Sequence, residues 1–177
     1  MKLKTIHKKI ANCKLCELSI TRNVTVPGEG SPNSKIFLVG EAPGKNEDKT
    51  GKPFCGSAGK ILTEMLNHIG ISREDVFITS ILKCRPPKNR LPKKSEANLC
   101  INTHLIPQMD SIKPDVIVLM GLSAIKHVFD KVEIKKEHGR FRQKDGRNYF
   151  LTYHPAAVLY RRKLMDVIKA DFEKLLQ

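Results

Sequence analysis

Three polar segments of the sequence carry residue types that could act on a substrate. Residues 41–54 begin with the carboxylate of Glu41, directly after the apolar run 36–39 and Gly40, and end in the aromatic ring of Phe54. Residues 80–90 are the second segment, and residues 153–159 are the third, with His154 before Pro155. A carboxylate and an imidazole are the usual groups for general acid–base work and for stabilising charge. Each alone is also typical of an ordinary loop, so it is their joint placement that indicates a site.

Four of the five cysteines have the spacing of a metal or cluster site. Cys13 and Cys16 form a C-x2-C pair, and Cys84 and Cys100 follow far downstream with fifteen residues between them. Four thiolates from two distant segments can close around one centre. The long second spacing favours an iron–sulfur cluster over a tetrahedral zinc ion; zinc and unligated core cysteines stay open as alternatives. Cys55 stands apart, and we interpret it as a small apolar filler.

Hydrophobic periodicity predicts the elements that must position these segments. Strands are expected at 36–39, 76–82 and 115–120, with a hairpin over 140–153 that turns at 145–146 and has 149–152 as its inner strand. Helices are expected at 3–10, 58–69, 95 to about 109, 123–129 and 160–176, and an irregular loop at 85–94. Strands separated by helices predict an α/β fold with a mostly parallel sheet covered on both faces. Ligands of such sheets bind at the carboxyl ends of the strands, where the three polar segments begin.

The composition restricts the class of protein. A chain of 177 residues suits a single domain over 1–177, and 32 Lys and Arg against 18 Asp and Glu give a net charge of +14. This excess predicts a polyanionic partner, most simply nucleic acid, and the alternative is a basic protein from a lysine-rich proteome. No apolar run is long enough to cross a membrane, and the basic N-terminus lacks the apolar core of a secretory signal. We therefore expect an intracellular, reducing setting without disulfides.

With these residues in view, the sequence resembles the family 4 uracil-DNA glycosylases over nearly its full length. The likeness rests on GEAPG at 40–44, EDKTGKPF at 47–54, KCRPP-x-NR-x-P at 83–92, HPA at 154–156 and the four spaced cysteines. It implies a three-layer α/β/α fold and hydrolysis of the N-glycosidic bond of uracil in DNA, which leaves an abasic site. It also implies a [4Fe-4S] cluster, usually taken as structural, held by Cys13, Cys16, Cys84 and Cys100.

The resemblance also assigns roles to single residues. His154 would donate to uracil O2 and stabilise the leaving anion, and Glu41 would lie near the sugar, where it could orient water. Phe54 would stack on the flipped base, and Glu47 would line the C5 edge, where bulk excludes thymine. The expected base-binding residues are Ala42, Gly44, Glu47, Phe54 and Ser80, with backbone amides of the turn 42–44 facing the base.

Contacts with DNA are expected from a segment that matches the family and from basic residues of the chain. The segment 154–159 would press into the minor groove with Leu159 as a wedge. Phosphate contacts are expected from Lys52, Lys83, Arg85, Arg90, Arg161 and Arg162, for each of which a solvated surface charge is the alternative. The expected partner is uracil-containing DNA, single- or double-stranded, bound by a monomer, because base flipping needs a free rim.

One departure concerns Ser80, since the family commonly places Asn at this position. An amide can pair with uracil O4 and N3–H together, whereas a hydroxyl is too short to reach both. The expectation is retained glycosylase activity with a lowered rate or altered base preference. Two alternatives stay open: a noncatalytic nucleic-acid-binding module on the same fold, and a zinc-stabilised nucleotide hydrolase.

Overall fold

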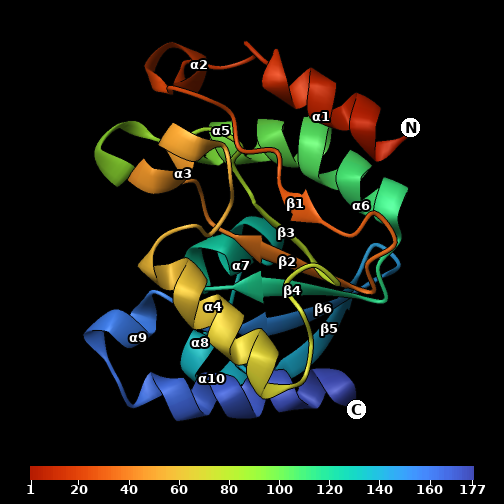
Figure 1. The fold of residues 1–177 in the computed structure, drawn as a ribbon, viewed down its shortest axis with the longest axis vertical. Helices are drawn as coiled ribbons and strands as arrows, with labels where there is room; N and C mark the ends of the chain where they lie inside the picture. The colour runs from red at the N-terminus through yellow and green to blue at the C-terminus, as the bar shows by residue number, and fades with distance from the viewer.

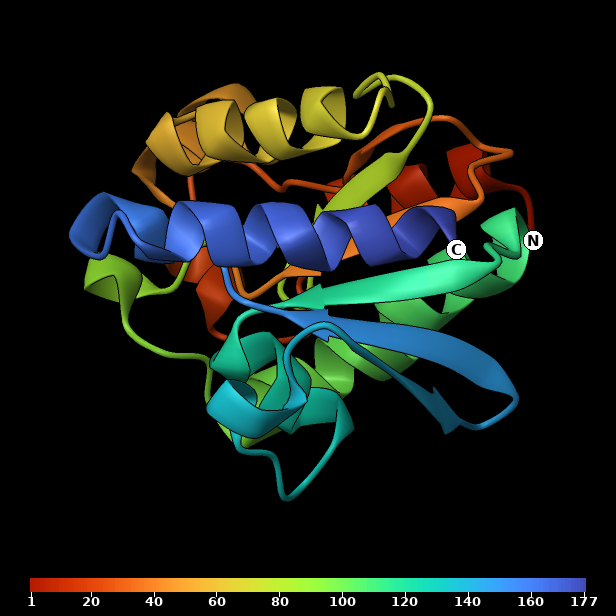
Figure 2. The same ribbon diagram turned by 90° about the horizontal axis from the view of Figure 1, so that it is seen from below.

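The computed structural model describes residues 1–177 and contains a six-stranded sheet between two layers of helices (Figures 1 and 2). The strand order is β1-β3-β2-β4-β6-β5. The strands are β1 (Glu29–Gly30), β2 (Ile36–Gly40), β3 (Phe77–Ser80), β4 (Val116–Met120), β5 (Arg140–Lys144) and β6 (Arg147–Thr152). The four inner strands are parallel, and β1 and β5 close the two edges antiparallel to their neighbours. The expected mostly parallel sheet is confirmed.

The sheet separates two apolar layers, because side chains alternate between its faces. Phe37 and Val39 of β2 pack in one layer with the long helical stretch α5 (Lys94–Cys100) to α6 (Ile106–Ile112). Leu38 packs in the other layer with α4 (Ser57–His68) and α10 (Leu164–Glu173). Figure 2 shows α4 and α10 on one side of the sheet and the α5–α6 stretch on the other. The expected three-layer α/β/α architecture is therefore confirmed.

The remaining helices lie around this framework. They are α1 (Leu3–Ala11), α2 (Leu18–Thr21), α3 (Lys45–Thr50), α7 (Leu122–Val128), α8 (Ile134–Glu137) and α9 (Ala157–Tyr160), with short 3-10 turns at Pro87–Asn89 and Lys174–Leu176. The predictions for α1, α4, α7 and the β5–β6 hairpin are confirmed. The helix expected from Ser95 is a continuous helical stretch over 94–112, which contains a π-helical turn at Ile101–Leu105.

The structure differs from the predicted elements at four places, where the local sequence pattern is weak. The expected polar loop after β2 contains helix α3, whose first turn is stabilised by Glu47 through a hydrogen bond with the Gly44 amide. The edge strand β1 was not expected, because a two-residue strand has no periodicity. The expected helix 160–176 is broken at Arg161, whose backbone is not helical, and α10 begins only at Leu164. Strand β3 is shorter than expected and ends at Ser80.

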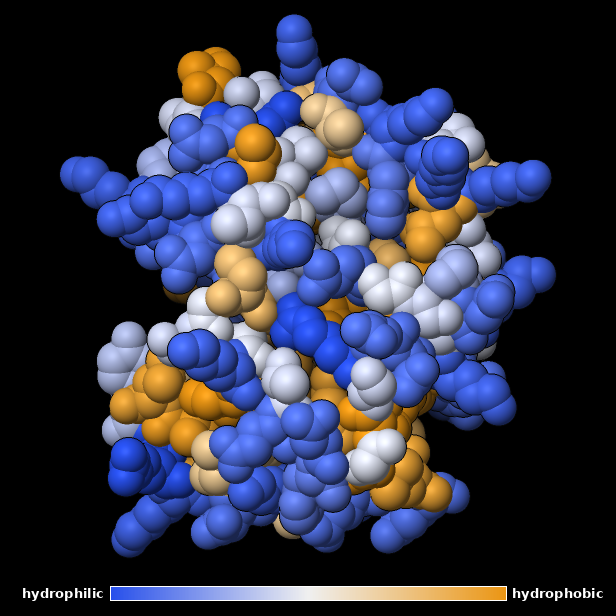
Figure 3. All heavy atoms as spheres, in the orientation of Figure 1, coloured by the Kyte–Doolittle hydropathy of each residue, from blue (hydrophilic) through white to orange (hydrophobic).

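Hydrophilic side chains cover most of the face drawn in Figure 3, with apolar patches between them. Among large apolar side chains, Ile20, Leu91 and Tyr160 are the most exposed, at 81%, 70% and 88%. None of the helices combines the length and the apolar character needed to cross a membrane.

Candidate active site

A cavity of about 160 Å³ lies where β2, β3 and β6 end. Parallel strands bring their carboxyl ends to one edge of a sheet, so the segments that follow them meet there. The cavity is lined by Val26, Ala42, Pro43, Gly44, Glu47, Pro53, Phe54, Ala58, Ser80 and His154. All three polar segments of the sequence contribute to this lining. The structure thus confirms that they converge on one rim of the sheet.

The rings of Phe54 and His154 are stacked in this cavity, with centroids 5.5 Å apart and planes inclined by 27°. Gly40, at the end of β2, leaves the space for the Phe54 ring, because a Cβ there would lie 2.6 Å from Phe54 Cζ. Gly121 does the same for His154, whose Cβ would be 2.8 Å from an added Cβ. These glycines permit the close approach of backbone and ring that a side chain would block.

His154 is neutral in this setting. Burial lowers its pKa from 6.5 to about 4, and the nearby negative charge of Glu47 opposes that shift. The backbone N–H of Ala156 donates to His154 Nδ1 at 3.1 Å, so Nδ1 carries no proton. A neutral imidazole that accepts at Nδ1 holds its proton at Nε2. His154 can therefore donate one hydrogen bond from Nε2 without being charged.

The Glu47 carboxylate connects two backbone segments through hydrogen bonds. Its Oε2 accepts from the Gly44 N–H and its Oε1 accepts from the Cys55 N–H, both at 3.1 Å. The amide of Gly44 is thus used inside the protein and does not face a substrate, contrary to the expectation for the turn 42–44. Pro43 has no N–H, so Ala42 supplies the remaining amide of this turn. Cys55 is exposed, which corrects its interpretation as an apolar filler.

Glu41 does not line the cavity, although its neighbour Ala42 does. Side chains alternate along a strand, and Gly40 faces the layer of α4, where Phe54 packs. The charge of Glu41 counteracts the lowering of the pKa of His127 by burial, so this carboxylate lies within electrostatic range of α7. The structure therefore brings the ring and the imidazole together and places the carboxylate beside them on the strand end.

Ser80 ends β3 at the floor of the cavity and is 6% exposed. Its carbonyl oxygen accepts from Lys83 Nζ at 2.8 Å, and Thr79 Oγ1 accepts from the same ammonium at 2.6 Å. Lys83 is 1% exposed, and burial lowers its pKa to about 7. The prediction that Lys83 contacts DNA phosphate is wrong, because its ammonium is enclosed within the protein.

The other expected DNA contacts lie nearer the surface. Lys52 is exposed beside Phe54, and Leu159 is 53% exposed on α9. Arg85 donates to Asn89 Oδ1 at 2.7 Å. Arg90 makes a two-bond ion pair with Glu96, at 2.6 and 2.9 Å, so its guanidinium is already engaged. Arg161 and Arg162 are exposed after α9.

The four spaced cysteines lie against the α5–α6 layer. Burial raises the pKa of Cys84 to about 11, and Cys100 and Cys16 contribute to the same shift. Burial also raises the pKa of Cys100, with contributions from Cys16 and Cys13. The thiols are thus near enough to influence one another. In this structure no three of these thiols are arranged so that they could bind one metal ion together.

Cations and an imidazole surround these thiols, and sequence reasoning missed them. Arg22 Nη1 lies 3.1 Å from Cys84 Sγ and its Nη2 donates to Cys13 O at 2.6 Å. His104 Nε2 lies 3.2 Å from Cys13 Sγ, and its Nδ1 has no hydrogen-bond partner. Neither residue stands in a recognisable motif, so no sequence signal could have identified it; only the fold brings them to the cysteines.

Residues 27–177 match the uracil DNA glycosylase superfamily. A type-4 uracil-DNA glycosylase of Sulfurisphaera tokodaii is 43% identical over 184 residues, which cover 98% of this chain and 83% of the relative. Relatives with the same description from Archaeoglobus fulgidus and Thermotoga maritima are 42% and 40% identical, covering 98% and 97% of this chain and 91% and 92% of their own.

Proposed function

The chain belongs to the uracil-DNA glycosylase superfamily and within it to the type-4 uracil-DNA glycosylases, and from this we propose that it hydrolyses the N-glycosidic bond of uracil in DNA and leaves an abasic site. The observation that carries the proposal is the cavity in which Phe54, His154 and Ser80 meet. Uracil within a duplex is unreachable, so the nucleotide must leave the stack and enter this cavity. The excess of 32 basic over 18 acidic residues supports binding to the DNA backbone.

His154 would stabilise the leaving group. Cleavage of the bond places negative charge on the uracil ring, and a preorganised donor stabilises that charge at no cost in reorganisation. The neutral imidazole has its proton at Nε2, since Nδ1 accepts from Ala156. It would donate to uracil O2 as charge develops, without protonating the base.

Glu41 would support the positive charge that develops on the sugar. Its position directly after β2, next to the cavity-lining Ala42, sets a carboxylate at the strand end outside the base-binding space. From there it could orient a water molecule and stabilise an oxocarbenium-like state.

Recognition of the base would fall to Phe54, Ser80 and the residues around them. A base stacked on an aromatic ring gains about 1–3 kcal/mol. Glu47 lines the cavity with both oxygens held by backbone amides, so it would act at the C5 edge as fixed bulk rather than as a mobile acid. Ser80 occupies the cavity floor, so the departure from the family's Asn affects the base-binding space itself.

We also propose that Cys13, Cys16, Cys84 and Cys100 hold a [4Fe-4S] cluster with a structural role. The donor set fits: four thiols surrounded by Arg22, His104 and the buried Lys83, which has no carboxylate partner. A buried ammonium requires a counter-charge, and an anionic thiolate-bound group would supply it. The cluster would join the N-terminal segment to the α5–α6 layer, and hydrolysis requires no electron transfer from it.

The test of activity is excision from a uracil oligonucleotide, read as alkali-sensitive abasic sites, with protein handled anaerobically. Glu41→Ala and His154→Ala should each reduce excision by about two orders of magnitude while DNA binding is largely retained. A matched control is Glu74→Ala, which removes a carboxylate from the loop after α4, away from the cavity lining. Full activity in both site variants would contradict the assignment. Binding without excision by the native protein would favour the noncatalytic alternative that Ser80 keeps open.

The cluster has its own measurement, independent of activity. Anaerobically purified protein should absorb in the visible range and contain iron, and Cys84→Ser should lose both. Cys55→Ser is the matched control, because Cys55 lies outside the four-cysteine site and is exposed. Stoichiometric zinc without iron would contradict the proposal. Light scattering would test the accompanying proposal that the protein acts as a monomer, and a single cooperative unfolding transition would support the proposal that residues 1–177 form one domain.

A further inference from the structure

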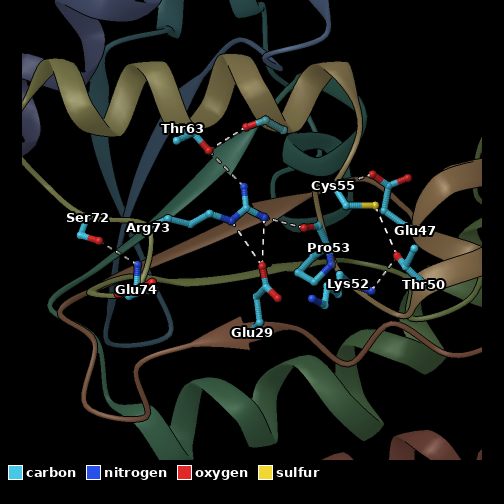
Figure 4. A network of polar contacts seen from close by, with 11 residues as sticks. Glu29, Glu47, Thr50, Lys52, Pro53, Cys55, Thr63, Ser72, Arg73 and Glu74 are labelled. Carbon is cyan, nitrogen blue, oxygen red and sulfur yellow. Dashed lines mark hydrogen bonds and ion pairs between the residues drawn. The ribbon is translucent and has the colours of Figure 1, made fainter.

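Arg73, in the loop after α4, is the centre of a polar network that reaches back to the segment before that helix (Figure 4). Its Nη2 donates to the carbonyl oxygen of Pro53 at 2.5 Å and lies 3.1 Å from Glu29 Oε1. Its Nε donates to the same carboxylate oxygen at 3.3 Å, and its Nη1 to Thr63 Oγ1 at 3.4 Å. One guanidinium thus connects β1, the entrance of α4 and the middle of α4.

The Pro53 carbonyl belongs to the peptide that leads directly into Phe54. Phe54 has φ of +48°, a left-handed conformation that is rare for a bulky side chain. Such a conformation persists only where the surroundings hold it in place. Gly59 provides the space it needs, because a Cβ there would lie 1.7 Å from the Phe54 carbonyl oxygen.

Both neighbours of Phe54 are held by side-chain contacts. Arg73 binds the Pro53 carbonyl on one side, and Glu47 accepts from the Cys55 N–H on the other. Figure 4 shows these two groups of contacts flanking the turn. With the peptides before and after it fixed, Phe54 has its ring directed over Gly40 and against His154.

We propose that Arg73 is a positioning residue for base stacking: with Glu29 as its anchor, it holds Phe54 in the left-handed conformation that presents its ring to the flipped base. This rests on the proposed function, in which Phe54 stacks on uracil. Glu29 is itself fixed by the pairing of β1 with β3, where it lies opposite Ile78. The edge strand therefore contributes to the site through Arg73, although it does not line the cavity.

The direct readout is the position of the Phe54 ring, which requires no DNA. The ring current of Phe54 shifts the NMR signals of the stacked His154 imidazole, so Arg73→Met should move these signals toward the values seen in Phe54→Ala. Arg73→Lys, which keeps the charge but can bond only one partner well, should give an intermediate shift. Arg147→Met is the matched control, since it removes a comparable ion pair, 2.6 Å from Asp110, at the distant hairpin.

The kinetic readout is a double-mutant cycle in single-turnover excision. Arg73→Met should raise the half-saturating enzyme concentration about tenfold and change the maximal rate less than about threefold, because stacking is lost equally before and during bond cleavage. In a Phe54→Ala background the same substitution should change either value less than about twofold, since the ring that Arg73 positions is gone.

Three results would overturn the inference. The His154 signals would stay in place in Arg73→Met, or they would move as far in Arg147→Met, or Arg73→Met would weaken excision equally with and without Phe54. A different result bears on the proposed function: if Phe54→Ala excises uracil like the native protein, the stacking role fails. The imidazole signals still decide in that case whether Arg73 positions the ring.

Discussion

We predict that His154 stays neutral at every pH above about 5, so that excision near neutrality does not depend on its titration. Burial lowers the pKa of His154 from 6.5 to about 4. At 1.36 kcal/mol per pH unit, this difference disfavours the imidazolium in the folded protein by at most about 3 kcal/mol. The penalty is large enough that less than about one molecule in a hundred would carry the charge at pH 7.

The lowered pKa of His154 makes the free energy of unfolding depend on pH, because the unfolded chain binds the proton at a higher pH than the folded protein does. In the unfolded chain His154 has its ordinary pKa, so protonation begins there as the pH falls below 6.5. The free energy of unfolding therefore falls progressively as the pH drops from 6.5 to about 4, because only the unfolded chain binds the proton in this range. Above pH 6.5 His154 is neutral in both states, and it no longer makes the free energy of unfolding depend on pH.

The assay is an NMR titration of histidine-labelled protein, with His154→Gln used to assign the signal. We expect a midpoint near 4 and a single-turnover excision rate without an inflection from this group between pH 5 and 8. Phe54→Ala should raise the midpoint toward 6.5, because removing the stacked ring admits water to the imidazole. A midpoint at or above 6.5 in the native protein would refute the reasoning. So would an excision rate that falls with the protonation of His154 in this range.

Two further predictions concern the cavity and the turn that carries Phe54. Ser80→Asn should raise excision of uracil or sharpen its discrimination against cytosine, since an amide that pairs with a base edge is worth about 1–3 kcal/mol. Comparing U·G, U·A, hypoxanthine and single-stranded uracil substrates measures this, and an unchanged profile would count against it. Gly59→Ala should lower the free energy of unfolding by about 2 kcal/mol or more and weaken excision, because its Cβ would overlap the Phe54 carbonyl. Chemical denaturation checks this against Ser57→Ala, an exposed position in the same helix turn, and equal stability of the two variants would contradict it.

Much of the fold could be predicted from local pattern. Continuous apolar runs identified β2 and β4, which are buried on both faces, and the turn at Asp145-Gly146 identified the β5–β6 hairpin. The 3.6-residue period of apolar residues identified α4, because burial of one face repeats along a helix. The same rule could not identify β1, which is too short to show a period. It also missed the break between α9 and α10, because the apolar stripe continues across the non-helical residue Arg161.

The sequence predicted which residues form the candidate site better than it predicted their positions and burial. The convergence of the three polar segments followed from the parallel sheet, and Phe54 and His154 do meet in one cavity. Lys83 was misjudged because a lysine in a loop motif is usually solvated, whereas here its ammonium is enclosed by Thr79 and Ser80. Burial depends on what other segments cover a residue, and no local pattern records that.

The sequence by itself determined which chemical groups stand at the strand ends, how the four cysteines are spaced and which elements carry them, because these properties depend on neighbours along the chain. Tertiary structure alone decided that Glu41 lies outside the cavity lining, that His154 is neutral and that Arg73 binds the peptide before Phe54. These three features depend on where a side chain lies, on its burial and on its contacts with residues up to about a hundred positions away in the sequence. Such contacts exist only once the sheet has brought the segments together.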